Sequence, residues 1–194
     1  MKPASSASPH AIIMIGIPGA GKSTFAERFA DTFQALLVSQ TKLQRYYGMS
    51  EEASFELRDA LLTEYIKTKR TILIDGGADS KDVRDELIKR MKKVGYQPLI
   101  VWVQTDTAEA ERRALKTYPQ GSGLTIDAFN AYVDSFDAPH AREKTVVISG
   151  KHTYTSQLKM ILKHIAGGVS HPAHSSPSHP STNNRPYPRQ VTGR

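Results

Sequence analysis

Residues 11–33 read AIIMIGIPGAGKSTFAERFADTF, and this stretch decides the fold. Its first five residues are apolar and predict a short buried strand. Phe25, Phe29 and Phe33 then recur at four-residue steps, the spacing of one apolar face of a helix. Residues 16–23, which lie between, match the pattern G-x-x-x-x-G-K-[ST] in full. A buried strand that passes into a helix through such a loop predicts a site for the phosphates of a nucleoside triphosphate.

Each residue type in this loop suits phosphate binding. The glycines let the backbone curl so that successive N–H groups point at phosphate oxygens, and the helix N-terminus adds a partial positive charge. Lys22 supplies a full charge for the β- and γ-phosphates, the Ser23 hydroxyl is placed to ligate Mg²⁺, and Thr24 can contact the α-phosphate. We therefore expect the nucleotide to contact Gly16, Pro18, Gly19, Ala20, Gly21, Lys22, Ser23 and Thr24.

Strands and helices alternate along the rest of the chain. Apolar runs predict further strands at 35–38, 71–74, 99–103 and 145–148. Helices are predicted between them, with N-caps at Ser50, Asp79 or Ser80, Asp106 and Thr125. Their core-facing residues are expected to include Leu57 and Leu62, Leu87 and Met91, Ile126 and Phe129, and Ile161. Strands separated by helices of about 10–15 residues predict an α/β protein, a three-layer α/β/α fold with a five-stranded parallel sheet. Ligands of such sheets bind at the carboxyl ends of the strands.

An acidic residue stands at one of these strand ends. Asp75 follows the apolar run 71–74 directly, and Gly76-Gly77 then lets the backbone pass close to a ligand. A carboxylate beside a phosphate loop suits the water shell of Mg²⁺. It could alternatively accept a proton from an attacking hydroxyl, or be a solvated aspartate that begins a turn. Ser23 and Asp75 are therefore the candidate metal ligands.

Composition limits the partners and the cofactors. The 194 residues include no cysteine, which excludes disulfides and cysteine-based zinc or iron–sulfur sites. The formal net charge is +7, of which Arg185, Arg189 and Arg194 lie at the C-terminal end. The remaining mild excess of positive charge suits a protein that binds phosphorylated ligands, and it allows a nucleic-acid partner without requiring one. The sequence does not show the oligomeric state.

The chain divides into three parts. Residues 1–10 are small and polar and are expected to be a flexible N-terminus, and residues 11–166 are expected to form the globular domain. Residues 167–194 are rich in Pro, Ser and His and are expected to be a disordered tail. No apolar run approaches the ~20 residues that span a bilayer, so we expect no membrane partner and a cytoplasmic location.

Four local patterns together resemble the P-loop kinases of the polynucleotide-kinase and zeta-toxin type, over about residues 11–165. The first is the loop GIPGAGKST at 16–24, and the second is the segment 38–48, which ends in tyrosine and glycine. The third is IDGGADS at 74–80, which is similar to a D-G-T-N-x-S turn of that group. The fourth is AERR at 110–113, similar to the arginine-bearing helix that begins a mobile lid.

This resemblance implies an enzyme. It would transfer the γ-phosphoryl group of ATP, with Mg²⁺, to a hydroxyl of a small molecule, a nucleotide or a nucleic-acid end. Lys22, Asp75, Arg112 and Arg113 are the implied catalytic residues, with both arginines clamping ATP phosphates from a small helical lid at about 112–140. A solvated helix face, paired with neighbouring glutamates, is the other interpretation of these arginines. The loop 149–151 would lie near the adenine.

The acceptor side departs from the pattern of that group. Thr41 stands where the group has an aspartate that orients the acceptor hydroxyl, and Gln44 stands where it has an arginine. Threonine is not a general base near neutral pH, so either Asp75 takes that role, or Arg45 and Lys42 hold an unusual acceptor, or transfer is weak. A second hypothesis is therefore an ATP-binding module with weak or no phosphotransferase activity. A GTPase switch ranks last, because the sequence has no Asn-Lys-x-Asp motif to read guanine.

Overall fold

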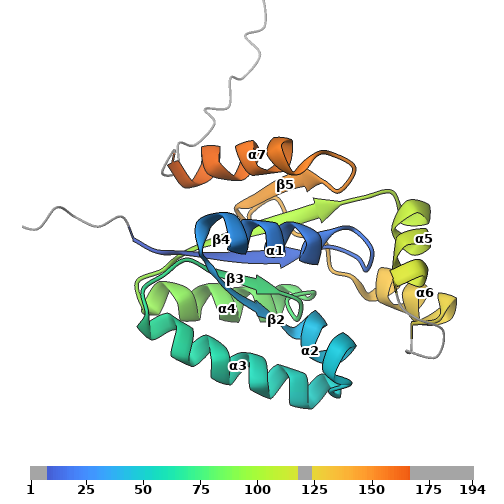
Figure 1. Cartoon of the computed structure of the whole chain (residues 1–194), viewed down its shortest axis with the longest axis horizontal. Coiled ribbons are helices and arrows are strands. Elements are labelled where there is room, and N and C mark those ends of the chain that lie inside the picture. Colours follow the sequence, from blue (N-terminus) through green and yellow to red (C-terminus); the bar gives the residue numbers. More distant parts are fainter. Residues whose placement is uncertain (1–7, 118–123, 167–194) are drawn as a thin grey trace, which may run out of the picture.

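The computed structural model describes residues 8–117 and 124–166. The predicted tail and residues 118–123 of the predicted lid lie outside the described residues. Five strands form one parallel sheet, in the order β2-β3-β1-β4-β5 (Figure 1). The strands are β1 (His10–Ile15), β2 (Leu36–Ser39), β3 (Ile72–Asp75), β4 (Gln97–Gln104) and β5 (Thr145–Ser149). The predicted five-stranded parallel sheet is confirmed.

The centre of the sheet is the strand that leads into the phosphate loop. β1 lies between β3 and β4, with Ile13 opposite both Ile74 and Ile100. Residues 11–15 are at most 1% exposed, because helices cover both faces of this strand. That double burial explains why the sequence of β1 is continuously apolar rather than alternating.

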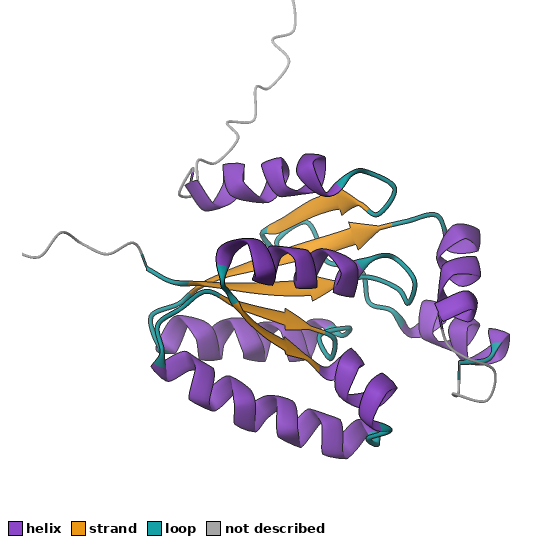
Figure 2. Ribbon diagram, in the orientation of Figure 1, coloured by secondary structure: helices purple, strands orange, loops and turns teal. Residues whose placement is uncertain are grey.

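Helices cover both faces of the sheet and complete the three layers (Figure 2). On one face α1 (Lys22–Phe33) and α7 (Tyr154–Ala166) pack through residues that include Phe25, Phe29 and Ile161. On the other face α3 (Glu51–Lys67) and α4 (Lys81–Lys93) pack through residues that include Leu62, Leu87 and Met91. None of the helices in the described parts of the chain has the length and apolar content needed to cross a membrane.

The other helices of the described residues lie at the end of the sheet to which the strand arrows point in Figure 1. They are α2 (Gln40–Tyr47), α5 (Thr107–Thr117) and α6 (Ile126–Ser135). α5 and α6 have a small core of their own, in which Ala110, Ala114 and Phe129 are fully buried and Ile17 of the phosphate loop packs against them. The helices thus surround the carboxyl edge where the ligand was expected.

The capping residues predicted from sequence are confirmed. The side chains of Ser50, Ser80 and Thr125 each accept a hydrogen bond from the backbone N–H three residues on. Asp106 does the same at the start of α5, through Glu109 N. The strand β1 begins at His10, one residue before the predicted start of the domain.

Several details of the prediction are wrong. Helix α2 was not predicted, and three residues expected in the core are largely exposed: Phe33 (44%), Leu57 (38%) and Ile126 (53%). In α3 the inward positions are Ser54, Arg58 and Leu62, so that Leu57 points to one side. The first half of this helix carries polar residues inward because Ser54 and Arg58 contact Gln40 and Gln44 of α2. Phe33 and Ile126 lie in the last and first turns of their helices, where less of the core is opposite them.

Candidate functional site

The phosphate loop joins the end of β1 to the start of α1 in a tight bend. Gly16 and Gly19 have φ values of 138° and 77°, which residues other than glycine rarely adopt. A Cβ at Gly16 would lie 2.5 Å from the carbonyl oxygen of Val103, and one at Gly19 would lie 1.9 Å from that of Ala110. The glycines are therefore required by the path of the backbone, and the loop has the form expected of a phosphate cradle.

The lysine of the loop is buried inside it. Lys22 is 9% exposed, and its ammonium group donates to the carbonyl oxygens of Gly16 (2.5 Å) and Ile17 (3.1 Å). Burial lowers the pKa of Lys22, and the negative charges of Asp75 and Asp79 act against that shift. A buried ammonium group with only carbonyl partners is a position where a phosphate group would be bound strongly.

Asp75 lies at the carboxyl end of β3, between β2 and β1, and is fully buried. Its Oδ2 accepts hydrogen bonds from the hydroxyls of Ser23 (2.8 Å) and Ser39 (2.7 Å). Its Oδ1 is buried and has no hydrogen-bond partner within the described ranges. The structure thus brings together the two residues that the sequence predicted as metal ligands.

These two residues fit a magnesium ion that is also held by a nucleotide. Mg²⁺ prefers oxygen ligands and is commonly bound through one or two protein groups, phosphate oxygens and water. Ser23 offers a hydroxyl and Asp75 offers a carboxylate with one unpartnered oxygen. No group of three or more His, Asp or Glu side chains that could hold a metal occurs in residues 8–117 and 124–166. The described protein ligands therefore suit a shared ion rather than a cage made by the protein alone.

The two predicted arginines occupy different positions. Arg113 lies on α5 with its side chain 33% exposed, and it donates to Glu109 Oε1 (2.7 Å) and to the carbonyl oxygen of Gly150 (3.0 Å). Arg112 is 64% exposed and makes a two-pronged ion pair with Glu109. Hydrogen bonds from Arg112 and Arg113 lower the pKa of Glu109 to about 2. Arg113 connects the start of the predicted lid to the loop that follows β5.

A cleft of about 630 Å³ runs from the phosphate loop to α2 and α6. Arg113 and most of the predicted loop residues line it, whereas Gly16, Ala20, Asp75 and Arg112 do not. The lining residues outside the phosphate loop and α5 are called the far side of the cleft below, and they include Gln40, Thr41, Gln44, Arg45, Glu51, Gly76, Gly77, Asp79 and Tyr132. Lys42, which was considered as a contact to the acceptor, does not line this cleft and instead pairs with Glu27 at 3.0 Å.

Beneath the far side lies a buried group of hydrogen-bonded polar residues, Arg58, Gln40 and the turn at Gly77, here called the polar floor, which the sequence analysis did not predict. Arg58 of α3 is 3% exposed and donates to the carbonyl oxygen of Gly77 (2.9 Å) and to Gln40 Oε1 (3.4 Å). Burial lowers the pKa of Arg58. A Cβ at Gly77 would lie 2.3 Å from the guanidinium, so the missing side chain is what lets Arg58 reach the turn. Arg58 stands four residues before the predicted core residue Leu62, and this spacing on one helix face could have indicated that Arg58 is buried.

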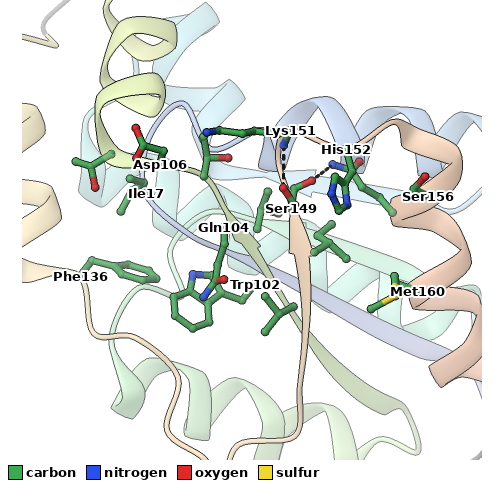
Figure 3. Close-up of a pocket in the computed structure, with 16 residues that line it drawn as sticks. Ile17, Trp102, Gln104, Asp106, Phe136, Ser149, Lys151, His152, Ser156 and Met160 are labelled. Atoms are coloured by element: carbon green, nitrogen blue, oxygen red, sulfur yellow. Dashed lines mark hydrogen bonds between the residues drawn. The ribbon is translucent and has the colours of Figure 1, made fainter.

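A second cavity lies at the ends of β4 and β5, with a volume of about 730 Å³ (Figure 3). Its lining includes Trp102, Phe136, Lys151, His152 and Met160. The rings of Trp102 and Phe136 lie 6.3 Å apart between centroids. The loop 149–151, predicted to lie near an adenine, stands between the two cavities. Lys151 borders the second cavity. The carbonyl oxygen of Gly150 accepts a hydrogen bond from Arg113, which lines the first cleft.

The sheet order, the phosphate loop and the buried lysine define a P-loop NTPase with the fold of the P-loop kinases. Residues 12–139 match the AAA domain family, and the chain belongs to this family. The fold predicted from the resemblance to P-loop kinases is thereby confirmed.

Comparison with curated proteins finds one related kinase. The chain is 28% identical over 112 residues to a shikimate kinase of Corynebacterium glutamicum. The match covers 53% of this chain and 62% of that enzyme, so it spans less than two thirds of the relative's length.

Solved structures with the same fold share little sequence with this chain. A gluconokinase of Sinorhizobium meliloti 1021 has a TM-score of 0.59 at 14% identity, over 84% of this chain and 94% of that one. The Mycobacterium tuberculosis APS kinase CysC, in complex with AMPPNP and APS, has a TM-score of 0.61 at 14% identity, over 84% and 99%. A chain of the Pnkp1/Rnl/Hen1 RNA repair complex has a TM-score of 0.58 at 21% identity, over 70% and 46%. At these identities the likeness shows the fold alone.

Proposed function

We propose that this protein is an ATP-dependent phosphotransferase that moves the γ-phosphoryl group of Mg·ATP to a hydroxyl group. The observation that carries the proposal is the arrangement of Lys22, Ser23 and Asp75 at the phosphate loop. The kinases named among the relatives, one of them bound to AMPPNP, support ATP as the donor. Their acceptors differ, and the acceptor of this chain is a small molecule, a nucleotide or a nucleic-acid end.

Each residue of the site has a role in this proposal. The backbone N–H groups of residues 16–24 hold the phosphates, and Lys22 leaves its carbonyl partners to bind the β- and γ-phosphates. Ser23 and Asp75 would hold Mg²⁺, which supplies neutralisation of the charge that develops on the phosphates. Arg113 clamps a phosphate from the side of α5. Arg112 would have to leave its ion pair with Glu109 before it could contribute.

The predicted organisation of the domain belongs to the same proposal. Residues from about 112 to 140 act as a lid that closes over the bound nucleotide, and Arg113 in the second half of α5 lies at the start of this lid. Closure would exclude water from the transferred group and so favour transfer over hydrolysis. We also propose a cytoplasmic location, where Mg·ATP is available as the donor.

A second function is favoured by one specific observation. Thr41 and Gln44, which replace an aspartate and an arginine of the kinases that the sequence resembles, both line the far side of the cleft. Gln44 donates to Ser54 Oγ (3.1 Å) and so belongs to the framework of the cleft. An ATP-binding module with weak or no transfer would keep the phosphate side and lose the acceptor side in this way.

One experiment separates the two functions. Purified protein is incubated with γ-labelled ATP, Mg²⁺ and a panel of nucleosides, sugar acids, shikimate and 5′-hydroxyl oligonucleotides. The kinase proposal expects labelled product on at least one acceptor, lost in Lys22→Ala and kept in Lys159→Ala, which removes an exposed lysine of α7. Saturable ATP binding with no product on any acceptor would instead assign the module.

A further inference from the structure

The far side of the cleft contains a carboxylate with no assigned task. Asp79 lies between β3 and α4 and lines the cleft together with Lys22, Ser23 and Gln40. It is half-buried, and no hydrogen bond or ion pair joins its carboxylate to another side chain among the described residues. Its negative charge acts on the ammonium group of Lys22 and on the guanidinium of Arg58. The carboxylate is thus close to both the phosphate loop and the polar floor of the acceptor side.

The other acidic residues near the cleft are less suited to receive a proton. Asp75 is fully buried, does not line the cleft, and already accepts hydrogen bonds from Ser23 and Ser39. Glu51 lines the cleft but is exposed at the start of α3. Thr41 lies directly over Gly76, where it offers only a hydroxyl. Asp79 is the half-buried carboxylate on the acceptor side of the described cleft.

The backbone that carries Asp79 is held firmly. Arg84 of α4 is fully buried and donates to the carbonyl oxygens of Ala78 (3.4 Å), Asp79 (3.1 Å) and Asp137 (2.8 Å). The backbone N–H of Asp137 also donates to the carbonyl oxygen of Asp79 (3.3 Å). A catalytic carboxylate needs such support, because small displacements of a reacting group cost a large part of the rate.

We propose that Asp79 is the catalytic base that replaces the aspartate missing at position 41. This inference rests on the proposed function. The acceptor oxygen attacks the γ-phosphorus and forms a new O–P bond, while the bond from phosphorus to the β–γ bridging oxygen breaks and its electron pair stays on ADP. The proton of the acceptor hydroxyl passes to the Asp79 carboxylate and from there to water. Arg84 is a positioning residue for this step.

The test compares Asp79→Asn with Asp82→Asn, which removes an equal charge from the exposed side of α4. Transfer to any acceptor found in the panel is measured together with hydrolysis of Mg·ATP, in which water takes the place of the acceptor. Loss of a general base predicts a fall in kcat of about 10²-fold or more for Asp79→Asn. The acid-side limb of its kcat/KM profile should disappear, and Asp79→Glu should restore part of the rate. Asp82→Asn should behave like the wild type.

Nucleotide binding distinguishes a catalytic loss from a damaged site. Calorimetry should show that Asp79→Asn binds Mg·ATP as well as the wild type or more tightly, because the variant removes a negative charge from a cleft that binds an anion. A variant that keeps the wild-type kcat and pH profile overturns the assignment of Asp79 and leaves the proposed function standing. A wild-type protein that binds Mg·ATP but neither transfers nor hydrolyses it overturns both.

Discussion

Replacing Arg84 with methionine should strongly destabilise the fold, because its guanidinium connects the turn after β3 to the segment before β5. The side chain is fully buried and forms a two-pronged pair with Glu143, at 2.7 and 3.1 Å, while the side chain of Glu143 is only 6% exposed. The guanidinium of Arg84 also donates to the carbonyl oxygens of Ala78, Asp79 and Asp137. Breaking a buried pair from one side leaves the other charge unpaired, which costs about 3–5 kcal/mol.

Urea unfolding followed by circular dichroism measures this loss. With a slope of about 2–3 kcal/mol/M, the midpoint of Arg84→Met should fall by about 1–2.5 M. Lys81→Met is the control on the same helix: it removes an exposed pair with Asp85, and the midpoint should hardly move. The double variant Arg84→Met/Glu143→Leu should regain part of the loss, because it leaves no buried charge behind. A loss below about 1 kcal/mol in Arg84→Met would refute the reasoning.

Three further predictions concern pH, the loop and the lid. Hydrogen bonds from Arg84 hold the pKa of Glu143 below its ordinary 4.5. The stability that this carboxylate contributes is therefore complete above pH 4.5 and is lost as the pH falls through the lowered pKa. Acid titrations should show that the difference in free energy of unfolding between the wild type and Glu143→Gln closes below about pH 4.5. Gly19→Ala places a Cβ 1.9 Å from a backbone oxygen of α5 and should weaken Mg·ATP binding at least about tenfold in calorimetry, and an unchanged affinity would contradict the described path of the loop. Arg113→Ala should raise the Kd for Mg·ATP about tenfold or more, and Arg112→Ala should raise it less because that side chain lies outside the described cleft; equal effects would contradict this assignment.

Those parts of the structure that depend on local sequence could be predicted. The phosphate loop has a fixed pattern of glycines and lysine, so its position between β1 and α1 followed from 23 residues of chain, 11–33. Ser50, Ser80 and Thr125 mark helix starts because their hydroxyls satisfy backbone N–H groups that the helix leaves free. Continuous apolar runs identified the strands, because helices cover a parallel sheet on both faces.

What could not be predicted depends on contacts between distant parts of the chain. Arg84 and Arg58 resemble ordinary surface arginines in the sequence, and only the fold shows that both are buried and which carbonyl groups they bind. Asp79 was considered as a helix cap, but Ser80 takes that place and Asp79 lines the cleft. Helix α2 has only eight residues and is polar apart from Leu43, Tyr46 and Tyr47, so its apolar pattern is too short to mark a helix in the sequence. The order of the strands is likewise set by packing rather than by local pattern.

The central claim is that the loop around Lys22 binds a nucleotide, and isothermal titration calorimetry tests it most directly. Titration of Mg·ATP into the wild-type chain should give a saturable heat with about one nucleotide bound per chain, and Lys22→Ala should abolish it while keeping the fold by circular dichroism. If the folded wild-type protein gives no saturable heat with either Mg·ATP or Mg·GTP, or if Lys22→Ala binds as tightly as the wild type, the loop does not have the role assigned to it.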